Sequence, residues 1–429
     1  MPFLTIEDPN AKIKGSRDPL GMVPIWVAFA RHVVTNLTTP SGSARGYTIL
    51  LLGRYFGAQL IDQGRIPREA ALDVVLRMEQ LGAYARHIGH AVERDIRGIE
   101  RVKKHLADGN GIVTIQANKE GLILADQKVY GLWGLFSVPA RTSGLIPEGS
   151  IGVERISSEF IEKNYLPHLE PHLPSLLHAL AKGDRLSTKA SKWPGYFEAL
   201  VDVLSEDFTL SESEFYGNYI RDGQLVKTNK QERQATFRRL LEEDDNLSTP
   251  TNREELLRLS RRAGKKDEVL ARALNRIIDL EALLAPADAV FNYLLLNRNK
   301  KPEEVGELVR AEWGKRVPYL DGSRFRELLP EVTNIAGPEQ TAAIAKCYDA
   351  FARGEYTEAA RSLLQWNAEV MAARKSAPWV RLDERGKIDV RYAGADQLFP
   401  NGEQLHYLWR NSYFIDSLKN ITRQLQEVA

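Results

Sequence analysis

Apolar residues recur at helical spacing along most of the chain. Between residues 44 and 63 they cover nearly the whole circumference of a helix, which is typical of a helix enclosed by its neighbours. Two capping-box patterns, Ser211-x-x-Glu214 and Thr251-x-x-Glu254, precede further apolar periodicity and indicate helix starts. The pattern predicts a mainly α protein, and a length of 429 residues predicts more than one domain.

Three short stretches interrupt the helical pattern, and we expect the strands of the protein there. Residues 111–117 (GIVTIQA) form a short run with several β-branched residues. Residues 145–156 place an apolar pair and an alternating run on either side of a glycine-containing turn. Residues 378–392 alternate on both sides of Glu-Arg-Gly-Lys at 384–387, which predicts a small β-hairpin near the C-terminus.

The order of elements in residues 96–166 is helix, strand, helix, helix, hairpin, helix. This is the order of a winged helix-turn-helix, so we predict a winged-helix-like module there. The chain then divides into three parts. We expect a helical N-terminal domain at 1–95, the module at 96–166, and a helical C-terminal region at 167–429 that contains the hairpin.

The predicted module suggests contact with DNA. Winged helices insert one helix into the major groove, while basic side chains beside it contact phosphates. Lys128, Arg141, Thr142 and Ser143 would lie on or beside the second and third helices, and Arg155 would lie on the wing. Many winged helices bind proteins instead, and acidic residues near the predicted wing weaken the DNA interpretation. Both partners therefore remain open.

Two polar, turn-rich segments near the N-terminus form a second candidate site. They span residues 15–21 and 36–46, and such residues can line a groove that binds an anion or a partner. Helix caps and tight turns are the alternative interpretation. The candidate groove residues are Arg17, Arg31, Thr38, Thr39, Ser43 and Arg45.

The sequence contains no motif that assigns a catalytic residue, a cofactor or a metal. There is no phosphate-binding loop, no dinucleotide-binding glycine pattern after a strand, and no nucleophile elbow. His168 and His172 have a spacing that suits zinc on a helix, but two prolines interrupt that helix. Cys347 is the only cysteine, and its helical apolar context predicts a buried thiol.

Composition and charge exclude few further classes of partner or function. The formal net charge of +1 indicates neither a nucleic-acid nor a membrane partner. The first residues lack the apolar core of a signal peptide, and the apolar runs are too short or too interrupted to cross a bilayer. We therefore expect a soluble, cytoplasmic protein without a membrane partner, whose oligomeric state the sequence leaves undefined.

Three segments of the first 170 residues carry a resemblance: GSRDPLGMVPIW, NLTTPSGSARGYTILLLG and QKVYGLWGLFSVPARTSGL. They resemble uncharacterised bacterial accessory proteins of antiphage-defence and nucleic-acid-processing operons. The resemblance implies a component of a multi-protein system and assigns no residue a role. We therefore expect a non-enzymatic scaffold or DNA-binding subunit of a prokaryotic nucleic-acid-handling complex. The alternative is an enzyme whose site is assembled from scattered residues of the N-terminal region.

Overall fold

The described part of the protein forms two compact units, each assembled from separated segments of the chain. The structure, a computed structural model, describes residues 18–426 except 110, 150, 224–228, 316, 318–319, 321–322 and 393–398. Unit 1 consists of Met1–Val33 and Pro250–Tyr413, and unit 2 consists of Val34–Thr249 and Phe414–Ala429. The three parts expected from the sequence, 1–95, 96–166 and 167–429, are consecutive stretches instead. The mainly α class predicted from the sequence is confirmed.

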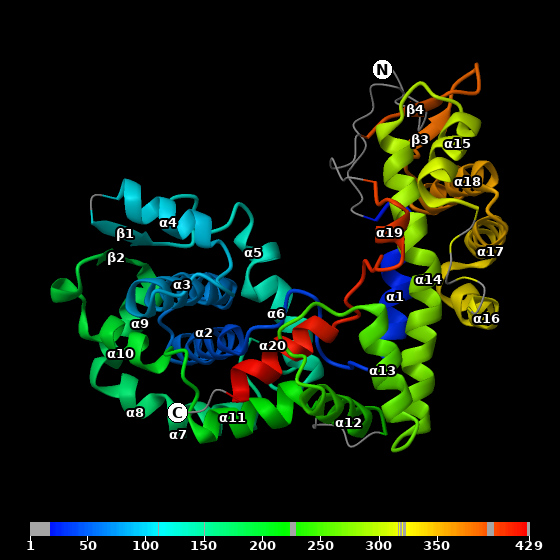
Figure 1. Ribbon diagram of the computed structural model, residues 1–429. Helices are drawn as coiled ribbons and strands as arrows, with labels where there is room; N and C mark the ends of the chain where they lie inside the picture. Colours follow the sequence, from blue (N-terminus) through cyan, green and yellow to red (C-terminus); the bar gives the residue numbers. More distant parts are fainter. Residues whose placement is uncertain are drawn as a thin grey trace. The chain divides into compact units, whose positions relative to one another are not determined.

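Unit 1 is built around its longest helix, α14, which packs against α1, α13, α16 and α18 (Figure 1). Its Asp267 N-cap accepts a hydrogen bond from the Leu270 backbone, and apolar side chains are buried on most of its circumference. The helices of this unit are α1 (Met22–Ala30), α13 (Arg253–Ala263), α14 (Glu268–Leu296), α15 (Pro302–Trp313), α16 (Phe325–Ala336), α17 (Pro338–Arg353), α18 (Tyr356–Ala373) and α19 (Gly402–Leu405).

The small hairpin predicted near the C-terminus is present in unit 1. Strands β3 (Val380–Leu382) and β4 (Ile388–Val390) pair in antiparallel fashion. The side chain of Asp383 accepts hydrogen bonds from the backbone of Arg385 and Lys387, and Gly386 takes a φ of 70°. The turn therefore uses the local chemistry that aspartate and glycine supply.

A buried carboxylate joins the end of unit 1 to α14. Glu281 is 1% exposed, and its Oε1 accepts hydrogen bonds from the backbone of Arg410 (2.7 Å) and Asn411 (3.0 Å). Its Oε2 accepts from the Asn411 side chain (3.0 Å) and from the Tyr413 hydroxyl (2.6 Å). Because a buried acceptor without donors is costly, these four bonds hold the segment against the helix.

Unit 2 is organised around α2, a helix that is buried on nearly every side, as its sequence pattern predicts (Figure 1). It contacts α3, α6, α7, α9 and α20. The helices of unit 2 are α2 (Ala44–Asp62), η1 (Arg68–Ala70), α3 (Ala71–Tyr84), η2 (Ala85–Gly89), α4 (Ile99–Asp108), α5 (Gln127–Tyr130), α6 (Leu132–Thr142), α7 (Arg155–Asn164), α8 (Leu166–Leu169), η3 (Glu170–His172), α9 (Leu173–Lys182), η4 (Ala190–Lys192), α10 (Gly195–Val203), α11 (Leu210–Tyr216), η5 (Gly217–Arg221), α12 (Asn229–Glu243) and α20 (Ile415–Gln426).

Glycine makes the close contact between α2 and α3 possible. A Cβ at Gly53 would lie 3.1 Å from the Cβ of Met78, and a Cβ at Gly82 would lie 2.6 Å from the Cδ1 of Ile49. Larger side chains at either glycine would push the two helices apart. The helices therefore pack backbone to side chain along this contact, which suits a helix pair at the centre of a core.

The winged-helix module is not confirmed. The strand predicted at 111–117 exists as β1 (Ile112–Ile115), but it pairs with β2 (Asp184–Ser187), which lies beyond the predicted module. The described residues between 145 and 154 contain no strand. The Leu145 carbonyl accepts a hydrogen bond from the Glu154 backbone at 3.0 Å and another from the Ser157 hydroxyl. The segment expected to form the wing is thus a loop before α7. Its apolar pair is buried in the core and does not pair with a second strand.

No helix within the described ranges is both long and apolar enough to cross a membrane.

Replacing Tyr413 by phenylalanine should lower the stability of unit 1. The change removes one donor from the buried Glu281 carboxylate, and a hydrogen bond to a charged group contributes about 1.5–3 kcal/mol. Urea unfolding followed by tryptophan fluorescence measures this loss. Tyr293→Phe is the matched control, because Tyr293 lies on α14 as Glu281 does but donates no hydrogen bond to it. This change should alter stability by less than about 0.5 kcal/mol. Equal urea midpoints for the two variants would show that the hydrogen bond from Tyr413 to Glu281 contributes nothing to stability.

Candidate functional site

The structure brings part of the predicted DNA-binding set together on α5 and α6. Lys128 on α5 and Thr142 at the end of α6 are exposed, and the Arg141 side chain is 37% exposed. Arg141 lies 3.2 Å from a carboxylate oxygen of the exposed Glu148. These three residues therefore share one helix pair and remain accessible.

The other two predicted DNA contacts lie elsewhere. Ser143 is 1% exposed, and its hydroxyl accepts a hydrogen bond from the side chain of Asn36 at 2.8 Å. Arg155 is the first residue of α7, where it lies 3.3 Å from Glu159 one turn along the helix. Ser143 thus stabilises the fold, and Arg155 is not on a wing because no wing is formed.

α5 and α6 pack tightly at their junction. A Cβ at Gly134 would lie 2.1 Å from the Val129 carbonyl oxygen and 2.7 Å from that of Lys128, so only glycine fits there. The first turn of α6 therefore lies directly against the end of α5. The exposed residues Gly134, Val138 and Thr142 follow at intervals of four, which places them in one row on α6. We call this row, with Lys128 and Arg141 beside it, the α6 face.

A buried carboxylate on α3 supports the α6 face from behind. Glu79 is 3% exposed, and it accepts hydrogen bonds from the Gln127 side chain and the Leu132 backbone, both at 2.8 Å. A Cβ at Gly131 would lie 2.5 Å from its Oε2. Burial raises the pKa of Glu79 to about 7, and the two hydrogen bonds oppose that rise only in part. One titratable group therefore holds both helices of the pair.

Most residues of the predicted anion or partner groove form helix caps and turns instead. Arg17 lies outside the described residues, and Arg31 is the C-cap of α1 in unit 1. In unit 2 the Ser43 hydroxyl caps α2 by accepting from the Gly46 backbone. The carbonyl oxygens of Thr38 and Thr39 accept hydrogen bonds from Ser417. The local alternative left open by the sequence thus accounts for these residues.

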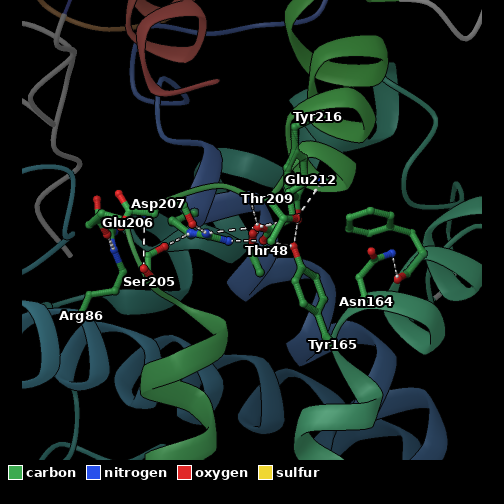
Figure 2. Close-up of polar contacts among 12 residues, drawn as sticks. Thr48, Arg86, Asn164, Tyr165, Ser205, Glu206, Asp207, Thr209, Glu212 and Tyr216 are labelled. Carbon is green, nitrogen blue, oxygen red and sulfur yellow. Dashed lines mark hydrogen bonds and ion pairs between the residues drawn. The ribbon is translucent and has the colours of Figure 1, made fainter. Parts of the chain in front are cut away.

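Arg45 is the exception, and it is buried instead of lining an open groove. It is 1% exposed and forms an ion pair with Glu212 of α11 (Figure 2). Its Nε donates to the Ser205 carbonyl, and its NH2 donates to the Asp207 carbonyl at 2.9 Å. The guanidinium also lies 3.9 Å from the centre of the Phe208 ring. The turn-rich segment around Arg45 had suggested a polar groove, but the arginine is enclosed in the core of unit 2.

The Glu212 carboxylate collects further donors. Its Oε1 accepts from the Tyr165 hydroxyl at 2.8 Å, and its Oε2 accepts from the Thr209 backbone at 2.9 Å, which closes the capping box of α11. The Tyr165 hydroxyl lies 3.2 Å from that of Tyr216, which in turn lies 2.8 Å from the Thr48 hydroxyl. Figure 2 shows this chain of contacts, which links α2, α11 and the turn between α7 and α8. We call it the Arg45 network.

The ionisation of the Arg45 network suits a structural role. Burial raises the pKa of Tyr165 well above its ordinary value and that of Tyr216 to about 12. Burial alone would lower the pKa of Arg45, but Tyr165 and Glu212 raise it by more, so that the net shift is upward. The phenols therefore stay protonated and the guanidinium stays charged at neutral pH. The network therefore positions the helices that it joins.

A cavity of about 380 Å³ lies over the Arg45 network. Lys163 and His168 line it from α7 and α8, whereas Asp202 and Asp207 line it from α10 and the loop that follows. In the sequence, His168 was a candidate only for metal binding, and the other three residues were not predicted to form a site. They are single charged residues on ordinary helix ends and loops, without a pattern that would distinguish them before folding.

Comparisons with protein-family models, with curated proteins and with solved structures found no match for this chain. Among the residues that the structure describes, no group of three or more His, Cys, Asp or Glu side chains is placed to hold a metal ion. The two candidate sites are therefore judged on their own geometry. They are the α6 face and the cavity over the Arg45 network.

Replacing Arg45 by methionine should destabilise unit 2 strongly. It leaves the Glu212 carboxylate buried without its cation, which costs about 3–5 kcal/mol. Thermal or urea unfolding measures the loss. Arg155→Met is the matched control, because Arg155 has a side chain 90% exposed and should cost less than about 0.5 kcal/mol. The double variant Arg45→Met with Glu212→Gln should lose less than the two single losses added together. An Arg45→Met variant as stable as the control would refute a structural role for the pair.

The stability of unit 2 should fall as the pH rises from about 4.5 to 7. Since folding raises the pKa of Glu79 to about 7, the folded state holds a proton that the unfolded state releases at lower pH. A rise of that size corresponds to about 3 kcal/mol, fully present at low pH and lost once the pH exceeds 7. Urea unfolding at a series of pH values measures this slope. Glu79→Gln should flatten it, whereas Glu170→Gln on the surface should not; identical slopes in both would contradict the assignment.

Proposed function

We propose that this protein is a non-enzymatic DNA-binding subunit of a multi-protein system that handles nucleic acid. The observation that carries the proposal is the α6 face, an accessible helix row with Lys128 at one end and Arg141 at the other. The α6 row from Gly134 to Thr142 is about 12 Å long at 1.5 Å per residue. The major groove of B-DNA is wide enough to admit an α-helix. A helix row of this length can therefore lie in the groove.

The chemistry along the face supports DNA as the partner. Lys128 and Arg141 supply cations for phosphates, which position a protein on the duplex. Between them, the exposed Val138 offers an apolar contact of the kind that thymine methyl groups accept. The Thr142 hydroxyl donates to the Val138 carbonyl at 3.0 Å, which leaves its lone pairs available as acceptors.

The existing pair between Arg141 and Glu148 does not block this role. The Glu148 side chain is 80% exposed, and exposed ion pairs contribute only about 0–1 kcal/mol. A DNA phosphate can therefore replace Glu148 at little cost. Glu79 favours the same role, because it fixes α5 and α6 from behind and so presents the face in a preformed geometry.

The wider setting of the proposal rests on the resemblance to bacterial accessory proteins. That resemblance favours a place in a prokaryotic system, with antiphage defence as its context and other subunits as protein partners. Docking of a protein on the α6 face is the scaffold alternative, because Val129 and Val138 are 47% and 51% exposed. The two partners differ in their dependence on salt, and this difference supplies the test.

Replacing Lys128 and Arg141 together by alanine should weaken binding to duplex DNA. Each phosphate contact contributes a slope of about −0.9 to the log–log dependence of affinity on salt, so the slope should flatten by roughly 2. Fluorescence anisotropy with a labelled duplex at several salt concentrations measures both effects. Thermal stability should stay within about 0.5 kcal/mol of the wild type.

The matched control is the double variant Arg361→Ala with Arg381→Ala in unit 1. Both side chains are about half exposed, at 53% and 43%, and the control removes the same total charge. It should keep the wild-type affinity and slope. A wild-type protein that does not bind duplex DNA at low salt would refute the proposal and favour protein docking. Equal losses of DNA affinity in the two double variants would show that the effect comes from net charge and not from the α6 face.

A further inference from the structure

The cavity over the Arg45 network is lined by charged side chains that have no interaction partner among the described residues. Within the described part of the chain, the side chains of Lys163, His168, Asp202 and Asp207 make no hydrogen bond or ion pair. All four are exposed. Oppositely charged side chains that line one cavity from different elements, each without a partner among the described residues, suit a ligand that carries both charges.

The floor of the cavity is electrically neutral. Arg45 and Glu212 both line it, and they neutralise each other in the buried ion pair. Beyond the ion pair, their hydrogen bonds go to Tyr165, Thr209 and two backbone carbonyls. The floor therefore contributes shape, and the charges that select a ligand come from the walls.

The Arg45 network also positions both walls. On one side, Arg45 donates to the carbonyl oxygens of Ser205 and Asp207, which fixes the loop that carries the Asp207 side chain. On the other side, Tyr165 donates to Glu212 and so fixes the chain directly after Lys163. Figure 2 shows Ser205 and Asp207 on one side of the ion pair and Tyr165 on the other. The two walls are thus preorganised around a common centre, which reduces the cost of ordering them on binding.

We propose that this cavity binds a small zwitterion with one excess positive charge, the chemistry of a dibasic amino acid. The two aspartates and the lysine give the walls a net charge of −1 if the histidine is neutral, and a ligand of net charge +1 balances it. Lys163 and His168 would hold the ligand's carboxylate. Asp202 and Asp207 would hold its two cationic groups, with the Ser211 hydroxyl as an additional partner.

The size of the cavity agrees with this ligand class. About 380 Å³ falls at the lower end of the range of roughly 300–1,000 Å³ in which proteins bind small molecules. The inference goes beyond the proposed DNA binding and is independent of it, because the α6 face contributes no residue to the cavity. Loss of one activity therefore does not predict loss of the other.

Isothermal titration of the full chain with L-arginine and L-lysine tests the proposal. Both should bind, and agmatine, which lacks the carboxylate of arginine, should bind roughly two- to fivefold more weakly, since an ion pair between exposed groups changes affinity by about that factor. L-Glutamate, with the opposite net charge, should not bind measurably. Absence of heat with both dibasic amino acids up to about 10 mM would overturn the proposal.

Two variants of the walls separate the roles of the charges. Asp202→Asn should weaken the binding of L-arginine and agmatine alike. Lys163→Met should weaken the binding of L-arginine but not that of agmatine, because agmatine has no carboxylate to lose a partner and its two cations are no longer repelled by the lysine. Glu170→Gln and Lys192→Met, exposed residues outside the cavity lining, are the matched controls and should bind as the wild type does. All side chains changed here are exposed, so the variants should fold. L-Arginine binding that survives both Asp202→Asn and Lys163→Met would place the ligand elsewhere and contradict the assignment.

Discussion

The buried ion pair between Arg45 and Glu212 is the interaction on which the architecture of unit 2 depends. Both side chains are almost fully buried, and a charge in such a place is tolerated only when it is paired and hydrogen-bonded. The pair meets this demand by recruiting the backbone of Ser205 and Asp207, the capping box of α11 and two tyrosine hydroxyls. Satisfying one buried cation therefore determines how α2, α11 and the α7–α8 turn meet.

The same physical constraint also acts at other buried carboxylates among the described residues. Glu281 in unit 1 and Glu79 in unit 2 are buried carboxylates that gather donors from segments distant in sequence. At each of them, the cost of leaving a buried acceptor without donors fixes the segment that supplies the donors. In unit 2, this leaves two surfaces well defined: the α6 face, supported by Glu79, and the cavity walls, supported by the Arg45 network.

Local chemistry explains which parts of the fold could be predicted from the sequence. The enclosed helix α2 and the hairpin of β3 and β4 were predictable, because apolar periodicity and a turn with aspartate and glycine encode them within a few residues. The partner of β1 was not. Strand β2 (Asp184–Ser187) has one apolar residue, Leu186, and lies about seventy residues along the chain, so neither alternation nor proximity indicates the pairing.

The candidate sites divide in the same way. Lys128, Arg141 and Thr142 could be found, since basic and polar residues within one helical pair are visible as a sequence pattern. The burial of Arg45 could not, because its compensating carboxylate is 167 residues away. The cavity walls were likewise not predictable, since Lys163 and Asp202 are 39 residues apart and line one cavity only in the folded protein.

Hydrogen–deuterium exchange of the full chain, with and without duplex DNA, tests the central claim most directly. Exchange protection reports which backbone segments a ligand covers or stabilises. The account predicts that DNA protects residues 127–142, which form α5 and α6, and leaves the hairpin of β3 and β4 unchanged. Protection confined to other segments, or none at DNA concentrations where the complex forms, would contradict the assignment of the α6 face as the DNA-binding surface.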